Sequence, residues 1–485
     1  MFDAKLRKRL NPAKIMILGF AGIILAGAAL LSLPAASRGA APAPFLVSLF
    51  TSVSAVCVTG LTVVDTAQAY SMFGQVVILC LFQIGALGFM TIATVFFFIM
   101  HRKINLSQRL LIMQSMNLND MRGVVRLIRH VIIGTVVFEG AGAAVLWVRF
   151  APEYGLWNGL GMGVFHAVSA FCNAGFDLMG GIGGDSFGRG VGIGSVGSIG
   201  SVGSFGSVGS FGSDGALSSF SSLSAYSGDT VIMATVMLLV VVGWLGFFVW
   251  DDIWRNRRFK RLHLHSKLVL VISSVLIISG WAFFYFAEMA NPATIGGMPL
   301  PVAALASLFQ SIMPRSGGFA VVDQASLTGA SKMMSALLML IGGSAGSAAG
   351  GIKNVTAGVL LLSAVHSLRG KSRLSVFGRT IPETQIVSML SILIMVLAAC
   401  FAGTAAISFI QPELHFQDVL FEIVSAVATC GLSSGITHLL SPASMVVVMM
   451  AMFFGRMGVM TFGMAAFFRR GSKDKTKHPD TWVMM

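Results

Sequence analysis

The chain has 485 residues, of which 55% are hydrophobic and only 11% are charged. Its mean hydropathy is +0.83, and apolar runs of about 18 residues or more recur along it, as membrane-spanning helices require. This composition excludes a soluble protein. The net charge of +14 lies in short Lys- and Arg-rich segments between the apolar runs, which indicates cytoplasmic loops of a protein in a lipid bilayer and no nucleic-acid partner.

A short pattern with a central glycine occurs four times, at Gly60, Gly175, Gly318 and Gly431. Each copy follows a short apolar run and precedes a longer one, so the chain is a fourfold internal repeat. A short helix that stops inside the bilayer leaves carbonyl groups unpaired, which is tolerated only inside protein or beside a water-filled cavity. We therefore expect an all-α polytopic membrane protein with eight transmembrane helices: four units of helix, re-entrant pore helix and helix around one pore.

The first repeat, residues 1–100, is expected to hold an outer helix at Lys14–Pro34, a re-entrant helix at Pro44–Val56, a glycine loop at Val58–Gly60 and an inner helix at Ser71–Met100. The basic N-terminus and the apolar run after it also resemble a cleavable signal. The run of about 19 residues is long enough to span the bilayer, so we expect it to be retained, with the N-terminus in the cytoplasm.

The second repeat, residues 101–250, is expected to follow the same order. Its outer helix should run over Arg126–Trp147, its re-entrant helix over Gly159–Phe171, its loop over Cys172–Gly175 and its inner helix over Asp229–Trp250.

A Gly- and Ser-rich insertion, residues 180–229, interrupts this second repeat. Glycine falls at every third position from Gly194 to Gly215, but that tract holds no proline. A collagen-like helix would lack its stiffening residue, so we expect a flexible, disordered external loop.

The third repeat, residues 251–366, is expected to begin near Ser266, to enter the membrane over Pro301–Ile312 and to pass its loop at Ser316–Gly318. Its inner helix should be broken at residues 341–353, where five glycines follow Ile341. Glycine costs about 1 kcal/mol relative to alanine in a helix, so the segment favours unwinding by roughly 5 kcal/mol. A loop inside the membrane at this depth would obstruct the pore; a small-residue face for helix packing is the alternative.

The fourth repeat, residues 367–470, is expected to place helices at Glu383–Phe409, Phe416–Ala428 and Pro442–Phe468, with a cytoplasmic tail at 471–485. The last of these helices carries Arg456. A lone arginine inside a membrane is costly, so we expect it either to face water in the pore or to extend to the cytoplasmic surface.

The four loops would form a filter in which backbone carbonyl oxygens replace the water shell of a cation, with potassium held at those carbonyls. The expected filter residues are Val58, Thr59, Gly60, Asn173, Ala174, Gly175, Ser316, Gly317, Gly318, Thr429, Cys430 and Gly431. Carboxylates beyond the glycines, Asp65, Asp177 and Asp323, would concentrate cations at an external mouth, unless they only cap solvated loops.

The four loop sequences, Cys-Val-Thr-Gly-Leu, Cys-Asn-Ala-Gly-Phe, Pro-Arg-Ser-Gly-Gly-Phe and Ala-Thr-Cys-Gly-Leu, resemble the filter loops of the Trk/Ktr/HKT superfamily of potassium transporters. Within it the chain is most similar to the ion-translocating membrane subunits of the Ktr type. The resemblance implies that the broken third inner helix forms a gating loop, with a basic residue at its end and an arginine opposing it. The implied gate residues are Gly342, Gly343, Ser344, Gly346, Ser347, Gly350, Gly351, Lys353 and Arg456.

The resemblance also implies potassium uptake across the plasma membrane by a homodimer seated on a cytosolic ring of nucleotide-binding regulatory subunits. No covalently bound cofactor is expected, and sodium is a candidate activator. A less selective sodium and potassium transporter of the same superfamily remains an alternative. Two other classes are weaker: an intramembrane hydrolase using Ser344 or Ser347 with His366, and a secondary carrier for an organic solute, which inverted repeats would favour.

Overall fold

The computed structural model describes residues 12–38, 42–88, 124–179, 223–370 and 374–458. These residues are mostly helical, with one antiparallel hairpin of two short strands, β1 (Ser375–Val376) and β2 (Arg379–Thr380). The expected tail 471–485 and residues 180–222 of the expected disordered loop lie outside the described residues. Residues 223–229 of that loop are packed, because Leu223 N donates to Ala320 O at 2.8 Å.

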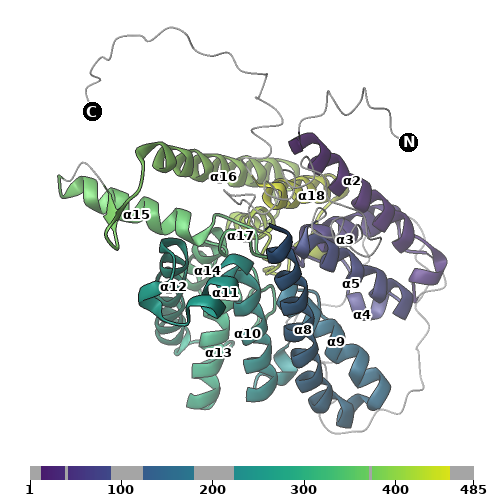
Figure 1. Ribbon diagram of the computed structural model, residues 1–485. Helices are drawn as coiled ribbons and strands as arrows, with labels where there is room; N and C mark the ends of the chain where they lie inside the picture. The colour runs from purple at the N-terminus through teal and green to yellow at the C-terminus, as the bar shows by residue number, and fades with distance from the viewer. Residues whose placement is uncertain (1–11, 39–41, 89–123, 180–222, 371–373, 459–485) are drawn as a thin grey trace, which may run out of the picture.

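The same order of three helices occurs four times, and Figure 1 shows the four sets in successive sectors of the molecule. The first set is α2 (Pro12–Leu31), α3 (Phe45–Cys57) and α5 (Met72–Leu87). The second is α8 (Val124–Tyr154), α9 (Leu156–Cys172) and α10 (Thr230–Leu245). The third is α12 (Leu264–Glu288), α13 (Leu300–Ile312) and α14 (Gly329–Leu340). The fourth is α16 (Glu383–Ile410), α17 (Phe416–Ala428) and α18 (Pro442–Met457).

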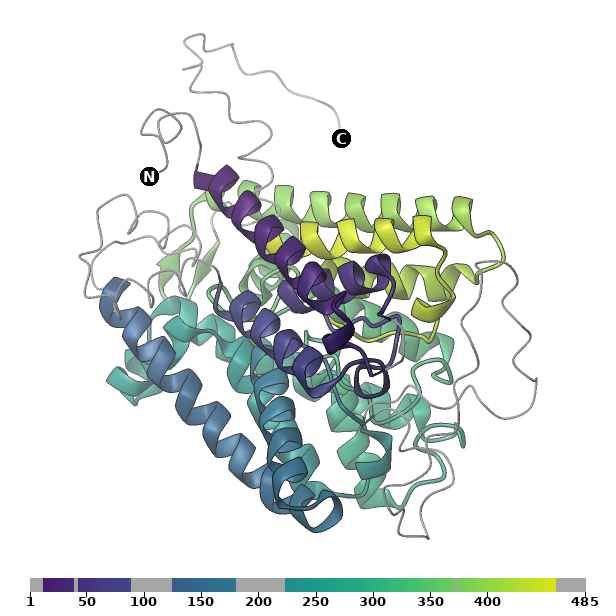
Figure 2. The same cartoon turned by 90° about the vertical axis from the view of Figure 1, so that its right-hand side faces the viewer.

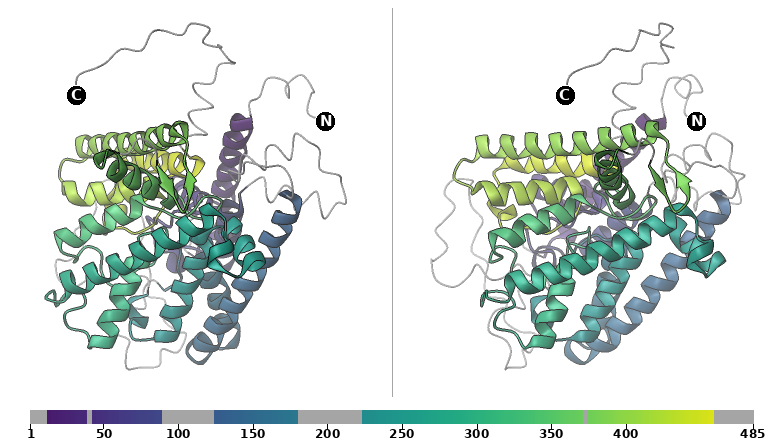
Figure 3. Two further views of the ribbon diagram at one scale, coloured as in Figure 1. Left: turned by 60° about the vertical axis from the view of Figure 1, so that its left-hand side comes forward. Right: turned by 90° about the vertical axis from the view of Figure 1, so that its left-hand side faces the viewer.

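Shorter elements connect these sets. They are η1 (Pro34–Ala36), α4 (Thr66–Ala69), η2 (Ser224–Tyr226), α11 (Phe247–Asn256), η3 (Phe259–Arg261), α15 (Asn354–Leu368) and η4 (Thr437–Leu439). The hairpin lies beside the start of α12 (Figure 3), where the Lys267 ammonium sits 5.9 Å from the ring centre of Phe377.

The sets close into a ring through one recurring contact. The last helix of each set packs on the short middle helix of the next: α5 on α9, α10 on α13, α14 on α17, and α18 on α3. Within the fourth set, α16, α17 and α18 run side by side (Figure 2). The short helices are largely buried in the centre, whereas the long first helices expose apolar side chains such as Phe286 and Phe401, each 78% exposed, as a lipid-facing surface requires.

Side chains cap the start of the last helix in every set. Ser71, Asp229, Thr328 and Ser441 accept hydrogen bonds from backbone N–H groups in the first turns of α5, α10, α14 and α18. Such N-caps stabilise a helix by about 1 kcal/mol each. The short middle helices lack side-chain caps at their starts, and three of them end in a left-handed residue that turns the chain into the glycine loop.

Fewer spans than the expected eight meet the length and apolarity that a membrane crossing needs. Within the described ranges three helices do, over Arg129–Tyr154, Leu264–Glu288 and Glu383–Ile410, and α10 with α11 makes a fourth if this pair, bent by 93°, counts as one span. The bend contradicts the expected continuous helix at Asp229–Trp250. Helix α14 ends at Leu340 and α15 begins at Asn354, so the helix is interrupted over the range where the sequence predicted a loop.

A Gly-x-x-Gly sequence ends three of the last helices. The pairs are Gly85 and Gly88, Gly243 and Gly246, and Gly455 and Gly458. A Cβ on the first glycine of each pair would lie 2.1, 2.0 and 2.0 Å from the carbonyl oxygens of Val56, Phe171 and Val427, near the end of the short helix in the same set. The second glycine has a φ of +80°, +93° or +76°, a conformation that glycine adopts without strain. Close packing and a backbone turn therefore coincide at these pairs.

We expect Gly455→Ala to lower the thermal stability of the detergent-solubilised protein, by about 1–3 kcal/mol for the forced overlap, although alanine is the better helix former. Gly140→Ala in α8 is the matched control, because no atom of the described residues lies within 4 Å of the added Cβ. That variant should gain up to about 1 kcal/mol. Equal effects of the two changes would contradict the packing described here.

Candidate functional site

The four glycine loops meet at the centre of the ring of helices. The position of a Cβ on Gly60 lies 2.9 Å from the Cα of Gly175, and a Cβ on Gly175 would lie 2.9 Å from the Cα of Gly318. A Cβ on Gly318 would lie 2.7 Å from Cys430 O, and one on Gly431 would lie 3.2 Å from the Cα of Gly60. The glycines thus neighbour one another in the cyclic order of the chain.

The carbonyl oxygen before each glycine faces the glycine of a neighbouring loop. Ala174 O and Thr59 O lie 2.4 and 2.1 Å from where a Cβ would stand on Gly60 and Gly431. Only glycine leaves room for this approach. Converging carbonyl oxygens can replace the hydration shell of a monovalent cation, so the loops that the sequence predicted as filter segments lie together in a suitable arrangement.

All four loops share one backbone pattern. The residue two before each glycine is left-handed: Val58, Asn173, Ser316 and Thr429 have φ of 57°, 58°, 78° and 49°. The glycines follow at 89°, 69°, 75° and 96°. Left-handed residues other than glycine cost about 1–2 kcal/mol each, and their recurrence at the same position of all four loops, with four different side chains, indicates that the surrounding structure requires this shape.

Hydrogen bonds from the short helices hold the loops in place. Ser54 Oγ accepts from Gly60 N, and Ser425 Oγ accepts from Gly431 N, both at 3.1 Å. In the second loop Ala174 N donates to Ser169 O at 2.8 Å. These bonds fix the glycines relative to the helix ends.

Several buried polar atoms in the loops have no protein partner among the described residues. They are Thr59 Oγ1, Asn173 Oδ1, Ser316 Oγ and Thr429 Oγ1. Unpaired buried polar atoms are uncommon in native proteins and point to water or an ion. Their presence in all four loops fits a hydrated ion path.

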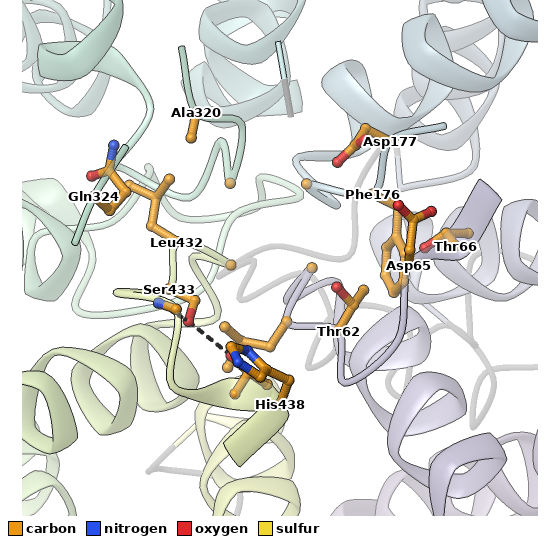
Figure 4. A pocket seen from close by; sticks show the side chains of 17 residues that line it. Thr62, Asp65, Thr66, Phe176, Asp177, Ala320, Gln324, Leu432, Ser433 and His438 are labelled. Atoms are coloured by element: carbon orange, nitrogen blue, oxygen red, sulfur yellow. Dashed lines mark hydrogen bonds between the residues drawn. The ribbon is translucent and has the colours of Figure 1, made fainter. Parts of the chain in front are cut away.

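On one side of the loops is a cavity of about 90 Å³ that contains all four glycines in its wall (Figure 4). Asp65 and Asp177 lie on one side of it, and Gln324 lies opposite. Asp65 also caps α4, accepting from Ala67 N at 2.8 Å. Asp323, the third carboxylate expected at the mouth, is not in this wall; its carboxylate accepts from Ser326 Oγ at 2.6 Å.

Buried polar side chains of the short helices bind the segments that leave the loops. In the fourth set Glu422 accepts from the hydroxyls of Ser433, at 2.8 Å, and Thr437. In the third set Gln310 Nε2 donates to Gln324 Oε1 at 2.8 Å. These residues were not predictable from the sequence, because one polar residue within a short apolar helix carries no periodic signal.

On the other side of the loops lies the segment between α14 and α15. Gly342 N donates to Ile352 O at 2.9 Å, which closes the segment on itself. A Cβ on Gly350 would lie 2.0 Å from Thr429 Oγ1 and 3.0 Å from Ala428 O. The expected intramembrane loop therefore touches the end of the fourth glycine loop's helix.

Backbone groups at the bend between α10 and α11 pair with this segment. Ser344 N donates to Trp244 O at 2.9 Å, and the Ser344 hydroxyl donates to Leu245 O. Phe247 N donates to Gly346 O at 3.0 Å. Carbonyls at a helix end have no intrahelical partner, so the bend at Gly246 supplies acceptors that the loop uses.

Arg456 and Lys353 donate to carbonyl oxygens in the middle of the same segment. The Arg456 guanidinium donates to Ala348 O and Gly85 O, and to Ala86 O at 3.3 Å. Lys353 Nζ donates to Ala349 O at 2.8 Å. Arg456 therefore links α18 to the loop and to the end of α5 instead of extending to the cytoplasmic surface.

The serines do not form a hydrolytic site with His366. The Ser344 hydroxyl donates a hydrogen bond to Leu245 O, and the Ser347 hydroxyl donates one to Ser344 O at 2.7 Å. His366 belongs to α15, beyond the loop, and no hydrogen bond joins it to either serine in the described residues.

One polar cluster unrelated to the expected sites lies behind the second loop. Gln83 Nε2 donates to Glu139 at 3.0 Å, and Cys172 Sγ donates to Gln83 Oε1 at 2.9 Å. Glu139 thus has a polar partner inside the bundle, as an acid within a membrane helix needs.

Comparisons with known proteins agree with this arrangement. The family model TrkH, described as a cation transport protein, matches residues 20–189 and 185–473. The potassium/sodium uptake protein NtpJ of Enterococcus hirae is 33% identical, with 99% of this chain and 98% of the relative covered. The Ktr system potassium uptake protein B of Bacillus subtilis is also 33% identical, with 97% and 96% covered. The crystal structure of the potassium transporter TrkH from Vibrio parahaemolyticus has a TM-score of 0.68 at 13% identity, covering 95% of this chain and 86% of that one.

Proposed function

We propose, from the premise that this chain belongs to the TrkH family of cation transport proteins, that it carries potassium ions into the cell. The family is one of transporters and not of enzymes, and the chain is a multi-pass membrane protein. The observation that carries the proposal is the cyclic approach of Gly60, Gly175, Gly318 and Gly431. The carbonyl oxygens of the loops would bind dehydrated potassium, the transported ion.

The filter is short in this proposal. Each loop offers one central glycine and the carbonyls on either side of it, and the third loop adds Gly317. The ladder of ion sites is therefore brief and rejection of sodium is modest. A relative named as a potassium/sodium uptake protein favours the second candidate, a less selective transporter of the same ions. The same comparison of potassium with sodium applies to the proposal that sodium activates transport.

We assign the gate to residues 341–353 together with Arg456. The loop lies against Thr429 on the side of the filter away from the acidic cavity, and Arg456 adds a positive charge there. In this proposal cation flow requires the loop and the arginine to move.

We also propose the larger assembly. Several relatives are named as proteins of a Ktr potassium uptake system, which supports association with other subunits. We propose that these subunits form a cytosolic nucleotide-binding ring beneath a homodimer of this chain. Both termini would be cytoplasmic and the four sets would supply eight membrane crossings, with the short helices α3, α9, α13 and α17 re-entering from outside.

The proposal is tested by expressing the chain in bacteria that lack potassium uptake. We expect growth at limiting potassium and uptake of potassium in preference to sodium from a mixture. Failure of the purified chain to move potassium in liposomes, with and without a cytosolic partner, would refute the proposal. Equal uptake of both ions would select the less selective candidate.

Asp65→Asn and Asp177→Asn are each expected to raise the external potassium concentration for half-maximal uptake by roughly threefold, with maximal uptake unchanged. Charges at a mouth concentrate counter-ions by long-range attraction, and asparagine keeps an oxygen that accepts the local backbone bonds. The effect should shrink at high ionic strength. Asp323→Asn should have a smaller effect, because Asp323 is outside the cavity wall; a larger effect there than at Asp65 would contradict the assignment.

A further inference from the structure

The third glycine loop differs from the others by one residue. Seven positions separate Ser311 from Gly318, whereas six separate the matching serine and glycine in the other three loops. Helix α13 ends at Ile312 and a wider turn follows. Arg315 lies in this turn and is fully buried.

Arg315 is not in the wall of the cavity that contains Asp65 and Asp177, and its side chain contacts Trp244 and the segment between α14 and α15. Its guanidinium carbon lies 4.1 Å from the ring centre of Trp244, in the last turn of α10. Nε donates to Ile341 O at 3.4 Å and Nη2 to Gly342 O at 3.3 Å. One arginine thus joins a filter loop, the end of an inner helix and the first residues of the intramembrane loop.

No carboxylate in the described ranges forms an ion pair with Arg315. A buried charge without an acidic partner is costly and needs compensating contacts. Here the compensation comes from an aromatic face and from carbonyls at the end of α14, where the helix dipole favours a cation. Movement of the intramembrane loop would leave the cation with Trp244 alone. Among the described residues, Arg315 Nη1 and Trp244 Nε1 have no hydrogen-bond partner.

We propose that Arg315 is a latch that couples the gate to the filter. It is a positioning residue: it holds Ile341 and Gly342 against the third filter loop, so that the intramembrane loop cannot move without releasing Arg315 or shifting the filter beside Ser316. Arg456, from α18, holds the middle of the same loop at Ala348, and its hydrogen bonds among the described residues go to this loop and to the end of α5, not to the third filter loop. This inference rests on the proposed potassium uptake.

The test compares Arg315→Gln, Arg315→Lys and Arg456→Gln in liposomes without any cytosolic partner. For Arg315→Gln we expect potassium flux per folded molecule to rise about tenfold, equivalent to about 1.4 kcal/mol, and discrimination against sodium to fall about threefold. Arg315→Lys keeps the charge but loses the planar fork, so it should change both quantities in the same direction by less. Arg456→Gln should raise flux and leave discrimination unchanged.

Wild-type flux and discrimination per folded molecule in both Arg315 variants would overturn the latch, as would lower flux with unchanged discrimination. If Arg315→Gln does not accumulate, Arg315→Lys and Trp244→Phe supply the same two measurements, because phenylalanine keeps a ring beneath the guanidinium. A wild-type chain that moves no potassium would refute the proposed function itself, which separates the two failures.

Discussion

Replacing Gly431 with alanine is expected to abolish potassium uptake. The added Cβ would lie 2.1 Å from Thr59 O, a carbonyl of the adjacent filter loop, and the φ of +96° is unfavourable for alanine. Relief of this overlap must displace the carbonyl or the loop. Overlap and left-handed strain together cost about 3 kcal/mol, which corresponds to a fall of about 100-fold in ion occupancy. Uptake of potassium or rubidium by cells or liposomes measures the loss.

Gly435→Ala is the matched control for this prediction. Gly435 lies in the same segment and in the wall of the same cavity, and its φ is +92°, but within the described ranges no atom lies within 4 Å of a Cβ there. Backbone strain is therefore similar in the two variants, and only Gly431→Ala displaces a filter carbonyl. Equal losses in both would mean that strain, and not the carbonyl ring, explains the defect.

Arg456→Gln is expected to open the pore. The change removes the charge beside residues 341–353 and the bonds to Ala348 O and Gly85 O. Charge-assisted bonds contribute about 1.5–3 kcal/mol, so flux without a cytosolic partner should rise at least about tenfold. Single-channel or liposome flux measurements report it.

Arg456→Lys separates the two contributions of this arginine. Lysine retains the charge but not the planar fork that reaches two chain segments. If the charge is the main barrier, Arg456→Lys should resemble the wild type; if the bonds to the loop dominate, it should resemble Arg456→Gln. Unchanged flux in Arg456→Gln would contradict the gate assignment.

The sequence predicted the short helices well because their limits are local. The expected helix at Phe416–Ala428 matches α17, and the expected start of the third short helix at Pro301 differs by one residue from Leu300. An apolar run of this length with a glycine loop after it fixes where the short helix begins and ends. The broken third inner helix was also predictable, because its five glycines weaken a helix by intrinsic propensity.

The remaining features depend on contacts between distant segments. The bend at Gly246 was not expected, since single glycines are common in membrane helices; it forms where the bend's carbonyls pair with Ser344 and Phe247 pairs with Gly346. The role of Arg315 likewise depends on partners far along the chain. The role of Glu422 depends on the turn that follows its own loop. The assignment of individual residues to filter and gate stays a prediction that function must test.

In the proposed function, the carbonyl oxygens of the four glycine loops bind the transported ion. Anomalous diffraction from crystals grown with rubidium in place of potassium tests it most directly. We predict a rubidium peak on the axis between Gly60, Gly175, Gly318 and Gly431, and its loss in Gly431→Ala crystals. Rubidium bound only elsewhere, with that axis empty in the wild-type protein, would contradict the account.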